Sequence, residues 1–171
     1  MILLEELEKS KQKNAQSMTL YNNVEGLFIS EAYMEIRTLS KEFYSEYGDC
    51  EEILKKITRP YYCLLLDIDE KKYAIPFRHH IKHPYAFITI GEAGLDFSKA
   101  VIISDERYLT QTPAIIDQAE FNIIKRSEQQ IKGKFRRYIH QYKRALRSPE
   151  KERSKRIIRF STLRYFLESC D

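Results

Sequence analysis

A change in the spacing of apolar residues constrains the fold of this chain more than any other feature. Residues 61–66 read Tyr-Tyr-Cys-Leu-Leu-Leu, a continuous apolar run rich in strand-forming side chains. A polar turn at 69–72 follows, and residues 73–77 return to a strand-like composition. Two such runs separated by a short polar turn predict a β-hairpin. Pro76, which has no N–H to donate, is expected at a strand end, a bulge or an edge.

Two further strand candidates, residues 85–90 and 100–103, are separated by an expected turn at 91–94. Together with the hairpin they predict a compact, mainly antiparallel sheet. Residues 121–147 then place apolar side chains at three- and four-residue spacing, which predicts a long amphipathic helix. Residues 157–167 are expected to return to the sheet as a last strand and turn.

The N-terminal third predicts more helix. Residues 30–47 carry apolar side chains at helical spacing, with Ser30 as the expected N-cap, and a short helix over 51–57 follows. The fold class is therefore α/β in the α+β sense, a twisted antiparallel sheet flanked by helices. Residues 1–18 are predicted to be a helical or loosely ordered extension, and residues 19–171 a single domain.

The sequence also predicts where the protein acts. Its longest apolar run is far too short to cross a bilayer, and its acidic start lacks the pattern of a secretory signal. The three cysteines are widely spaced and form no CxxC pair, which favours a reducing compartment over a disulfide framework. We expect a cytoplasmic protein with no membrane partner.

The charge is unevenly distributed along the chain. The formal net charge is only +4, yet residues 121–171 contain 15 Lys and Arg against 5 Asp and Glu. Such an asymmetry favours a polyanionic partner. The alternative is a solvated helix whose charge serves solubility alone. If the partner is RNA, the basic helix is the expected footprint, through Lys132, Arg136, Arg137, Lys143 and Arg144.

Three of the four histidines lie close together in the segment Arg78-His79-His80-Ile81-Lys82-His83-Pro84. No Asp or Glu occurs between residues 71 and 91, so no neighbour in sequence neutralises this cationic segment. Metal-independent RNA cleavage needs a base, an acid and a cation that holds the phosphate. Histidine titrates near neutral pH, and arginine stays charged. Arg78, His80, Lys82 and His83 are therefore the predicted catalytic residues.

Strand alternation separates the histidines further. If the strand continues through residue 80, His79 shares the buried face with Phe77, and Arg78 shares the opposite face with His80. His79 is then expected to be a hydrogen-bonded structural histidine, although the whole cationic segment, His79 included, is assigned to RNA contact.

Two other interpretations of the histidine segment stay open. His79 and His83 have the spacing of a helical zinc site, but no carboxylate or cysteine follows closely to complete it, so no metal and no cofactor is predicted. A surface loop whose histidines coincide by chance is the second. Ser161 and Thr162 are interpreted as structural residues rather than nucleophiles.

Several motifs, taken in order, resemble a known family. They are Phe28-Ile29-Ser30-x-x-Tyr33, Arg59-Pro60-Tyr61, Tyr73-Ala74-Ile75-Pro76-Phe77-Arg78-x-His80-Ile81-Lys82-His83, Gly94-Leu95-Asp96-x-Ser98-Lys99 and Phe160-Ser161-Thr162-Leu163-x-Tyr165-Phe166. Together they resemble the toxins of type III toxin–antitoxin systems, in the TenpN branch related to ToxN and AbiQ. The likeness covers residues 28–167.

The resemblance implies a bacterial, metal-independent endoribonuclease that leaves a 2′,3′-cyclic phosphate and takes part in phage defence. It implies inhibition by a small repeated antitoxin RNA, which the toxin processes and with which it assembles into a closed protein–RNA complex, besides cellular RNA substrates. It also implies a barrel similar to that of the MazF and Kid toxins. The RNA-contacting positions that it adds are Tyr33, Arg59, Ser98 and Lys99.

This chain departs from the ToxN pattern at the end of the strand. There ToxN has Pro-Leu-Thr-Ser-x-Lys, whereas Arg78 and His79 stand here at the Thr and Ser positions and Ile81 at the Lys position. Lys82 could replace that lysine after a one-residue slip. We expect the histidines to have taken over acid–base catalysis. The alternative is a non-catalytic RNA-binding protein that uses the basic C-terminal helix.

Overall fold

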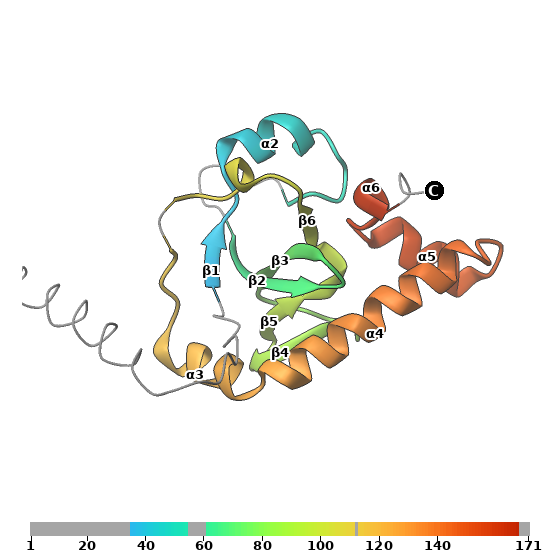
Figure 1. Cartoon of the computed structure of the whole chain (residues 1–171). Helices are drawn as coiled ribbons and strands as arrows, with labels where there is room; N and C mark the ends of the chain where they lie inside the picture. The colour runs from blue at the N-terminus through green and yellow to red at the C-terminus, as the bar shows by residue number, and fades with distance from the viewer. Residues whose placement is uncertain (1–34, 55–60, 112, 168–171) are drawn as a thin grey trace, which may run out of the picture. The chain divides into compact units, whose positions relative to one another are not determined.

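The computed structural model describes residues 35–54, 61–111 and 113–167, and these belong to one compact unit (Figure 1). The predicted boundary at residue 18 and the proposed N-cap Ser30 lie outside the described residues. The elements in chain order are β1 (Glu35–Thr38), α2 (Lys41–Tyr47), β2 (Tyr62–Ile68), β3 (Lys71–Arg78), β4 (Ala86–Ile90), β5 (Ala93–Asp96), η1 (Phe97–Lys99), β6 (Val101–Ile103), η2 (Glu106–Tyr108), α3 (Gln118–Arg126), α4 (Glu128–Leu146), α5 (Glu152–Phe160) and α6 (Arg164–Leu167).

The described strands form one antiparallel sheet of six strands in the order β1-β2-β3-β5-β4, with β6 also paired to β3. This confirms a mixed α+β fold with an antiparallel sheet. The path of the sheet is open, and these strands do not close into a barrel. Strand β3 is the centre of the sheet, since β2 pairs with one edge while β6 and β5 share the other.

The shared edge of β3 explains how a proline fits in a central strand. On that edge β6 pairs with β3 as far as Ala74, and β5 begins at Phe77. Pro76 falls between the two partners and pairs with Cys63 of β2 on the opposite edge. Of the three expected positions, a strand end, a bulge or an edge, the structure shows an edge, but a local one within a central strand. The missing N–H is accommodated there, because no described strand pairs with that edge at Pro76.

The predicted hairpin is confirmed as β2 and β3. The two residues between the strands, Asp69 and Glu70, have φ values of 49° and 62°. Positive φ at both central residues is the requirement of a tight type I′ turn, whose twist matches the twist of the flanking strands. The turn sets the register in which Ile68 pairs with Lys71 and Leu64 with Ile75.

Both faces of the sheet are covered, which explains why residues 63–66 of β2 are apolar without alternation. Helix α4 lies along one face and α2 lies on the other (Figure 1). Alternate residues of β2 point into the two cores, Leu64 toward Phe135 and Tyr142 of α4, and Leu65 toward Phe43 of α2. The buried stripe of α4 is the one that helical spacing predicts: Ile131, Phe135, Tyr138, Ile139, Tyr142 and Ala145.

The structure corrects four predicted elements. Residues 35–38, expected in a helix, form strand β1, and Ser40 is the N-cap of the shorter helix α2. The helix over 121–147 is two helices that meet at Ser127. The predicted turn at 91–94 contains the start of β5, and the tail forms α5 and α6 instead of a strand. Of the short helix expected over 51–57, residues 51–53 form turns and residues 55–57 lie outside the described residues.

Two glycines shape the β4–β5 hairpin, which supports the candidate site. Gly91 lies in the turn with a φ of 60°, a value that side chains rarely adopt. Gly94 lies where β5 is flanked by β3 and β4, and a Cβ atom there would be 2.1 Å from the carbonyl oxygen of Phe87. Only glycine permits this close approach of the two strands.

Candidate functional site

The histidine segment begins where β3 ends. The strand stops at Arg78, and the loop that follows is tied to the β4–β5 turn, because the Ile81 N–H donates to the carbonyl of Glu92 at 3.0 Å. The alternation argument holds for Tyr73, Ile75 and Phe77, which face the α4 core. It does not extend to His79, which is exposed. The expectation that His79 is a structural histidine was wrong, since the pleat ends before it.

The site is built around a buried carboxylate at the end of β5. Asp96 is fully buried, and its Oδ2 accepts a hydrogen bond from the Arg78 guanidinium at 2.6 Å. The Nε2 atom of His83 lies 3.4 Å from the same oxygen. The Arg78 and His83 side chains both remain about one third exposed. Asp96 therefore fixes Arg78 and His83 beside each other while both still reach the surface.

Other groups hold the Asp96 carboxylate in place. Its Oδ1 accepts hydrogen bonds from the backbone N–H of Ser98 at 3.0 Å and from the Ser98 hydroxyl at 2.6 Å, so that Asp96 caps η1. Burial by itself raises the pKa of Asp96. The hydrogen bonds from His83, Ser98 and Arg78 outweigh burial, and the pKa of Asp96 is lowered below its ordinary value. The site thus holds an ionised carboxylate at neutral pH.

One nitrogen of His83 is unpaired. Nδ1 of His83 is buried and has no hydrogen-bond partner among the described residues. Because Nε2 faces an ionised carboxylate, the proton of the neutral ring belongs on Nε2, and Nδ1 is then a free proton acceptor. An imidazole oriented by a carboxylate in this way can accept a proton, since the carboxylate stabilises the imidazolium that forms.

His80 has a different environment. Its side chain is 83% exposed, and its Nδ1 lies 3.3 Å from a carboxylate oxygen of Glu92. Its backbone has a φ of 57°, a strained value for a residue with a side chain. Lys82 is exposed beside it. The loop geometry thus directs the His80 side chain into solvent, next to Glu92 in the turn between β4 and β5.

The cationic segment is not free of carboxylates in space. The sequence lacks Asp and Glu between residues 71 and 91, but the next hairpin supplies Glu92 to His80 and Asp96 to Arg78 and His83. The expectation of an unneutralised segment was therefore wrong. Sequence reasoning missed Asp96 as the centre of the site. The sequence signal that could have identified Asp96 is an aspartate two residues before a serine, the pattern of a capping turn.

Two residues assigned to RNA contact lie in the interior. Ser98 is buried, and its hydroxyl donates to Asp96, so Ser98 supports the site without facing a ligand. The Lys99 ammonium forms an ion pair with Glu52 and also donates to the carbonyl of Phe160 at 3.1 Å. Its side chain is only 14% exposed. As placed, neither side chain is available to RNA. Tyr33 and Arg59 lie outside the described residues.

The Ser161–Thr162 pair is structural, as expected. Ser161 and Thr162 are fully buried. The Tyr138 hydroxyl donates to Ser161 at 2.7 Å, and Thr162 donates to the carbonyls of Ser98 and Ala100. These bonds attach the C-terminal helices to η1, directly behind the Asp96 site.

The predicted RNA-contacting cations of α4 fall into two groups. Arg136, Arg137, Lys143 and Arg144 are exposed. Lys132 is paired with Glu128 at 2.5 Å and is only 14% exposed, so it adds little to the field of this surface. Helix α5, whose last residues were expected in a strand, extends the basic surface with four exposed side chains: Arg153, Lys155, Arg156 and Arg159.

The zinc interpretation lacks its geometric basis. His79 and His83 lie in an irregular loop, so their spacing does not place them on one helix face. Within residues 35–54, 61–111 and 113–167, no group of three or more His, Cys, Asp or Glu side chains could hold a metal ion. The same ranges contain no helix with the length and apolar character needed to cross a membrane. Cys50 and Cys63 are free thiols.

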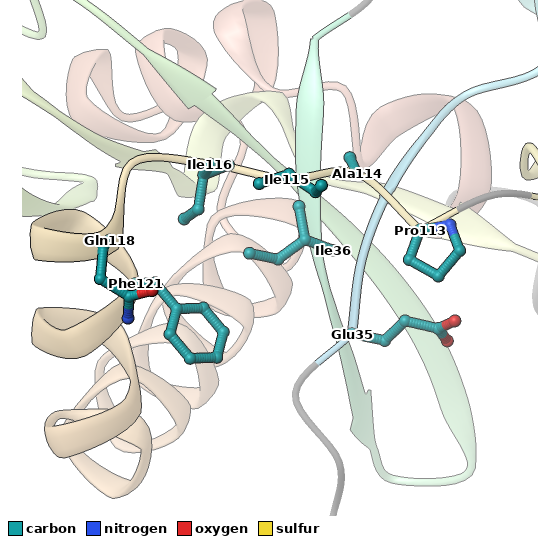
Figure 2. Close-up of a pocket in the computed structure, with 8 residues that line it drawn as sticks. All are labelled: Glu35, Ile36, Pro113, Ala114, Ile115, Ile116, Gln118 and Phe121. Carbon is teal, nitrogen blue, oxygen red and sulfur yellow. The ribbon is translucent and has the colours of Figure 1, made fainter. Parts of the chain in front are cut away.

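The structure also has a cavity away from Asp96, between β1 and the segment that leads to α3 (Figure 2). Its volume is about 550 Å³, and its walls are mainly apolar, with Ile36, Ile116 and Phe121 turned toward it. Among the described residues that line it, Glu35 is the only charged one, and Glu35 pairs with Arg37. A cavity lined by a carboxylate and no cation does not suit a phosphate. We therefore place the candidate site at Asp96.

Comparison with known proteins assigns no family. No family model matches the chain, no curated protein matches it, and no solved structure matches it.

Proposed function

We propose that this protein is a metal-independent endoribonuclease, the toxin of a bacterial type III toxin–antitoxin system that acts in the cytoplasm and in phage defence. The observation that carries the proposal is the convergence of Arg78 and His83 on the buried Asp96, beside an exposed basic surface. The ordered motifs shared with the TenpN, ToxN and AbiQ toxins supply the substrate class.

The reaction is transesterification of RNA. The 2′-oxygen attacks the adjacent phosphorus while the bond to the 5′-oxygen breaks, which leaves a 2′,3′-cyclic phosphate and a 5′-hydroxyl. A base removes the 2′ proton and an acid protonates the departing 5′-oxygen. Arg78 and Lys82 hold the phosphate as its negative charge increases.

The environments of the two histidines divide the proton transfers between them. His83 is the base, because Asp96 orients its Nε2 and leaves Nδ1 as a free acceptor. His80 is the acid, since it is exposed and its Nδ1 already lies against Glu92. Nδ1 of His83 is covered in the free protein, so the proposal includes a small movement of the ring or of its cover when RNA enters.

The wider proposal follows the resemblance. A repeated antitoxin RNA inhibits the toxin, is processed by it, and assembles with it into a closed protein–RNA complex. Exposed cations of α4 and α5 bind the phosphates of that RNA and of cellular RNA substrates. We also propose a relation of the sheet to that of the MazF and Kid toxins, in a form that is open rather than closed. A run of short tandem repeats in the DNA upstream of the reading frame would support this part.

The test is cleavage of RNA by purified protein in EDTA. We expect wild-type cleavage with cyclic phosphate ends, and a loss of roughly 100-fold or more in His83→Ala and in His80→Ala. His140→Ala is the matched control, because His140 is the exposed histidine of α4, outside the loop. Urea unfolding shows that each variant folds. Cleavage that stops in EDTA, or that persists undiminished in both loop variants, contradicts the proposal.

The second candidate is a non-catalytic RNA-binding protein. The exposed cations shared by α4 and α5 favour it. It predicts salt-sensitive retention of RNA with no cleavage at any pH, and expression toxicity that does not depend on His80.

A further inference from the structure

A second cavity adjoins the Asp96 site on the side of α4. It has a volume of about 220 Å³ and is lined by Pro84 and Tyr85 of the loop, by Ala86 at the start of β4, by Phe97, and by Lys134, Arg137, Tyr138 and Gln141 of α4. Its loop wall follows His83 directly in the chain, and Phe97 follows Asp96. The cavity therefore shares two chain segments with the proposed catalytic site.

Ring contacts connect this cavity to the catalytic histidine. The ring centroids of His83 and Tyr85 are 6.1 Å apart, and those of Tyr85 and Tyr138 are 5.4 Å apart. Tyr138 is held in position, because its hydroxyl donates to the buried Ser161. Tyr85 is only half-buried, so part of its ring is open to a ligand. The cavity is thus a partly open aromatic site beside the imidazole.

The lining combines three chemistries that suit a nucleotide. The partly exposed ring of Tyr85 offers aromatic surface, which stacks with bases of any type, and the buried Tyr138 supports it from behind. The Gln141 side chain carries both a donor and an acceptor, and an amide of this kind reads the edge of a base. The exposed Arg137 and the half-buried Lys134, which lies 5.2 Å over the Phe87 ring, supply positive charge for phosphate.

The size of the cavity limits what it holds. Pockets that enclose drug-sized ligands have volumes of about 300–1,000 Å³. A cavity of about 220 Å³ is smaller and suits one planar base. The cavity of Figure 2 is larger, but none of the described residues that line it is a cation that could meet a phosphate.

We infer that this cavity binds the base of the nucleotide next to the scissile phosphate, with stacking by Tyr85 and selection by Gln141. The inference rests on the proposed function, since it takes RNA as the substrate. It adds a specificity site: the base held here determines where the RNA is positioned against His83.

The first test uses cleavage of a randomised RNA in EDTA, with sequencing of the ends. Wild type is expected to prefer one base at a fixed position next to the cut. Gln141→Ala is expected to reduce that preference about fivefold or more, because it removes the edge contact. Gln130→Ala is the matched control, an exposed glutamine of the same helix outside the cavity. Tyr85→Leu keeps apolar packing but removes stacking, and is expected to lower cleavage about fivefold or more.

The second test does not need cleavage. Short 2′-O-methyl homopolymers of A, C and U cannot undergo 2′-oxygen attack, and their binding is measured by fluorescence anisotropy. We expect wild type to discriminate among them about fivefold or more, and Gln141→Ala but not Gln130→Ala to lose that discrimination. If wild type binds with this preference but never cleaves, the base site stands and the nuclease proposal fails. If wild type cleaves and Gln141→Ala retains the full base preference, the base site is overturned. Equal binding of all three probes together with base-independent cleavage also overturns it.

Discussion

His83 and Asp96 join two segments of the chain across the end of the sheet, with Nε2 of His83 3.4 Å from Oδ2 of Asp96. The same oxygen accepts the hydrogen bond from Arg78. One buried carboxylate therefore positions both the proposed base and the proposed phosphate-binding cation. Loss of its charge should affect stability as well as activity, because Arg78 and His83 then lose their ionised partner.

Asp96→Asn is expected to destabilise the protein by roughly 3 kcal/mol at pH 7. This is the lower end of the cost of breaking a buried ion pair, since Arg78 and His83 are partly solvated. The measurement is urea unfolding, with Asp67→Asn on the exposed side of β2 as the control. A variant as stable as wild type would contradict the central role of Asp96.

The Asp96 charge also predicts a pH dependence. The pKa of Asp96 in the folded protein is lowered from 3.8, so the folded state releases this proton more readily than the unfolded state. The contribution of ionised Asp96 to the free energy of unfolding is therefore fully present above about pH 4, and it is lost as the pH falls through the lowered pKa of Asp96. The stability difference between wild type and Asp96→Asn should therefore shrink as the pH falls below about 4. A difference that stays constant with pH would show that the charge is not the cause.

Gly94→Ala is expected to be severely destabilising. The added Cβ would lie 2.1 Å from the Phe87 carbonyl oxygen and 2.8 Å from the Cα of Ile88, both of them backbone atoms that cannot move independently. We expect a loss of roughly 4 kcal/mol or more, or failure to fold, measured by urea unfolding and by soluble yield. A loss below about 1 kcal/mol would mean that β4 and β5 are farther apart than described.

Gly133→Ala is expected to have the opposite effect. Gly133 lies inside helix α4, and apart from its chain neighbours and the backbone of its own helix, no atom of the described residues lies within 4 Å of the position of an added Cβ. The substitution should stabilise the protein by about 0.5–1 kcal/mol, because alanine has the higher helix propensity and restricts the unfolded chain. Thermal and urea unfolding measure the change. Destabilisation would indicate that α4 packs on this side against a group outside the described residues.

Arg144→Gln is expected to weaken RNA binding evenly across sequences and to reduce the slope of log affinity against log salt by about one. Arg144 is exposed on α4, within the basic surface. Lys41→Gln, at the exposed start of α2 on the opposite face of the sheet, makes the same change in charge and should leave the slope unchanged. Equal slopes for both variants would show that α4 does not contact the phosphates.

Sequence alone determined the elements whose signal is local. The β2–β3 hairpin follows from two apolar runs around a polar turn, and the buried face of α4 follows from helical spacing. Strand β1 was missed because its four residues lie within a pattern that also fits a helix. Strand β5 was missed because Gly91 and Gly94 together resemble a turn, although Gly94 lies within the strand and lets β4 approach.

Only the tertiary structure decided the composition of the site. Arg78 and Asp96 are 18 residues apart, and they meet because β3 and β5 pair at Phe77 and Arg78. The packing of the folded chain decided the rest. It places Ser98 and Lys99 in the interior and His79 on the surface, and it leaves Nδ1 of His83 without a hydrogen-bond partner among the described residues. Periodicity in a sequence reports which face of an element is apolar, whereas contacts between distant segments depend on strand order and register.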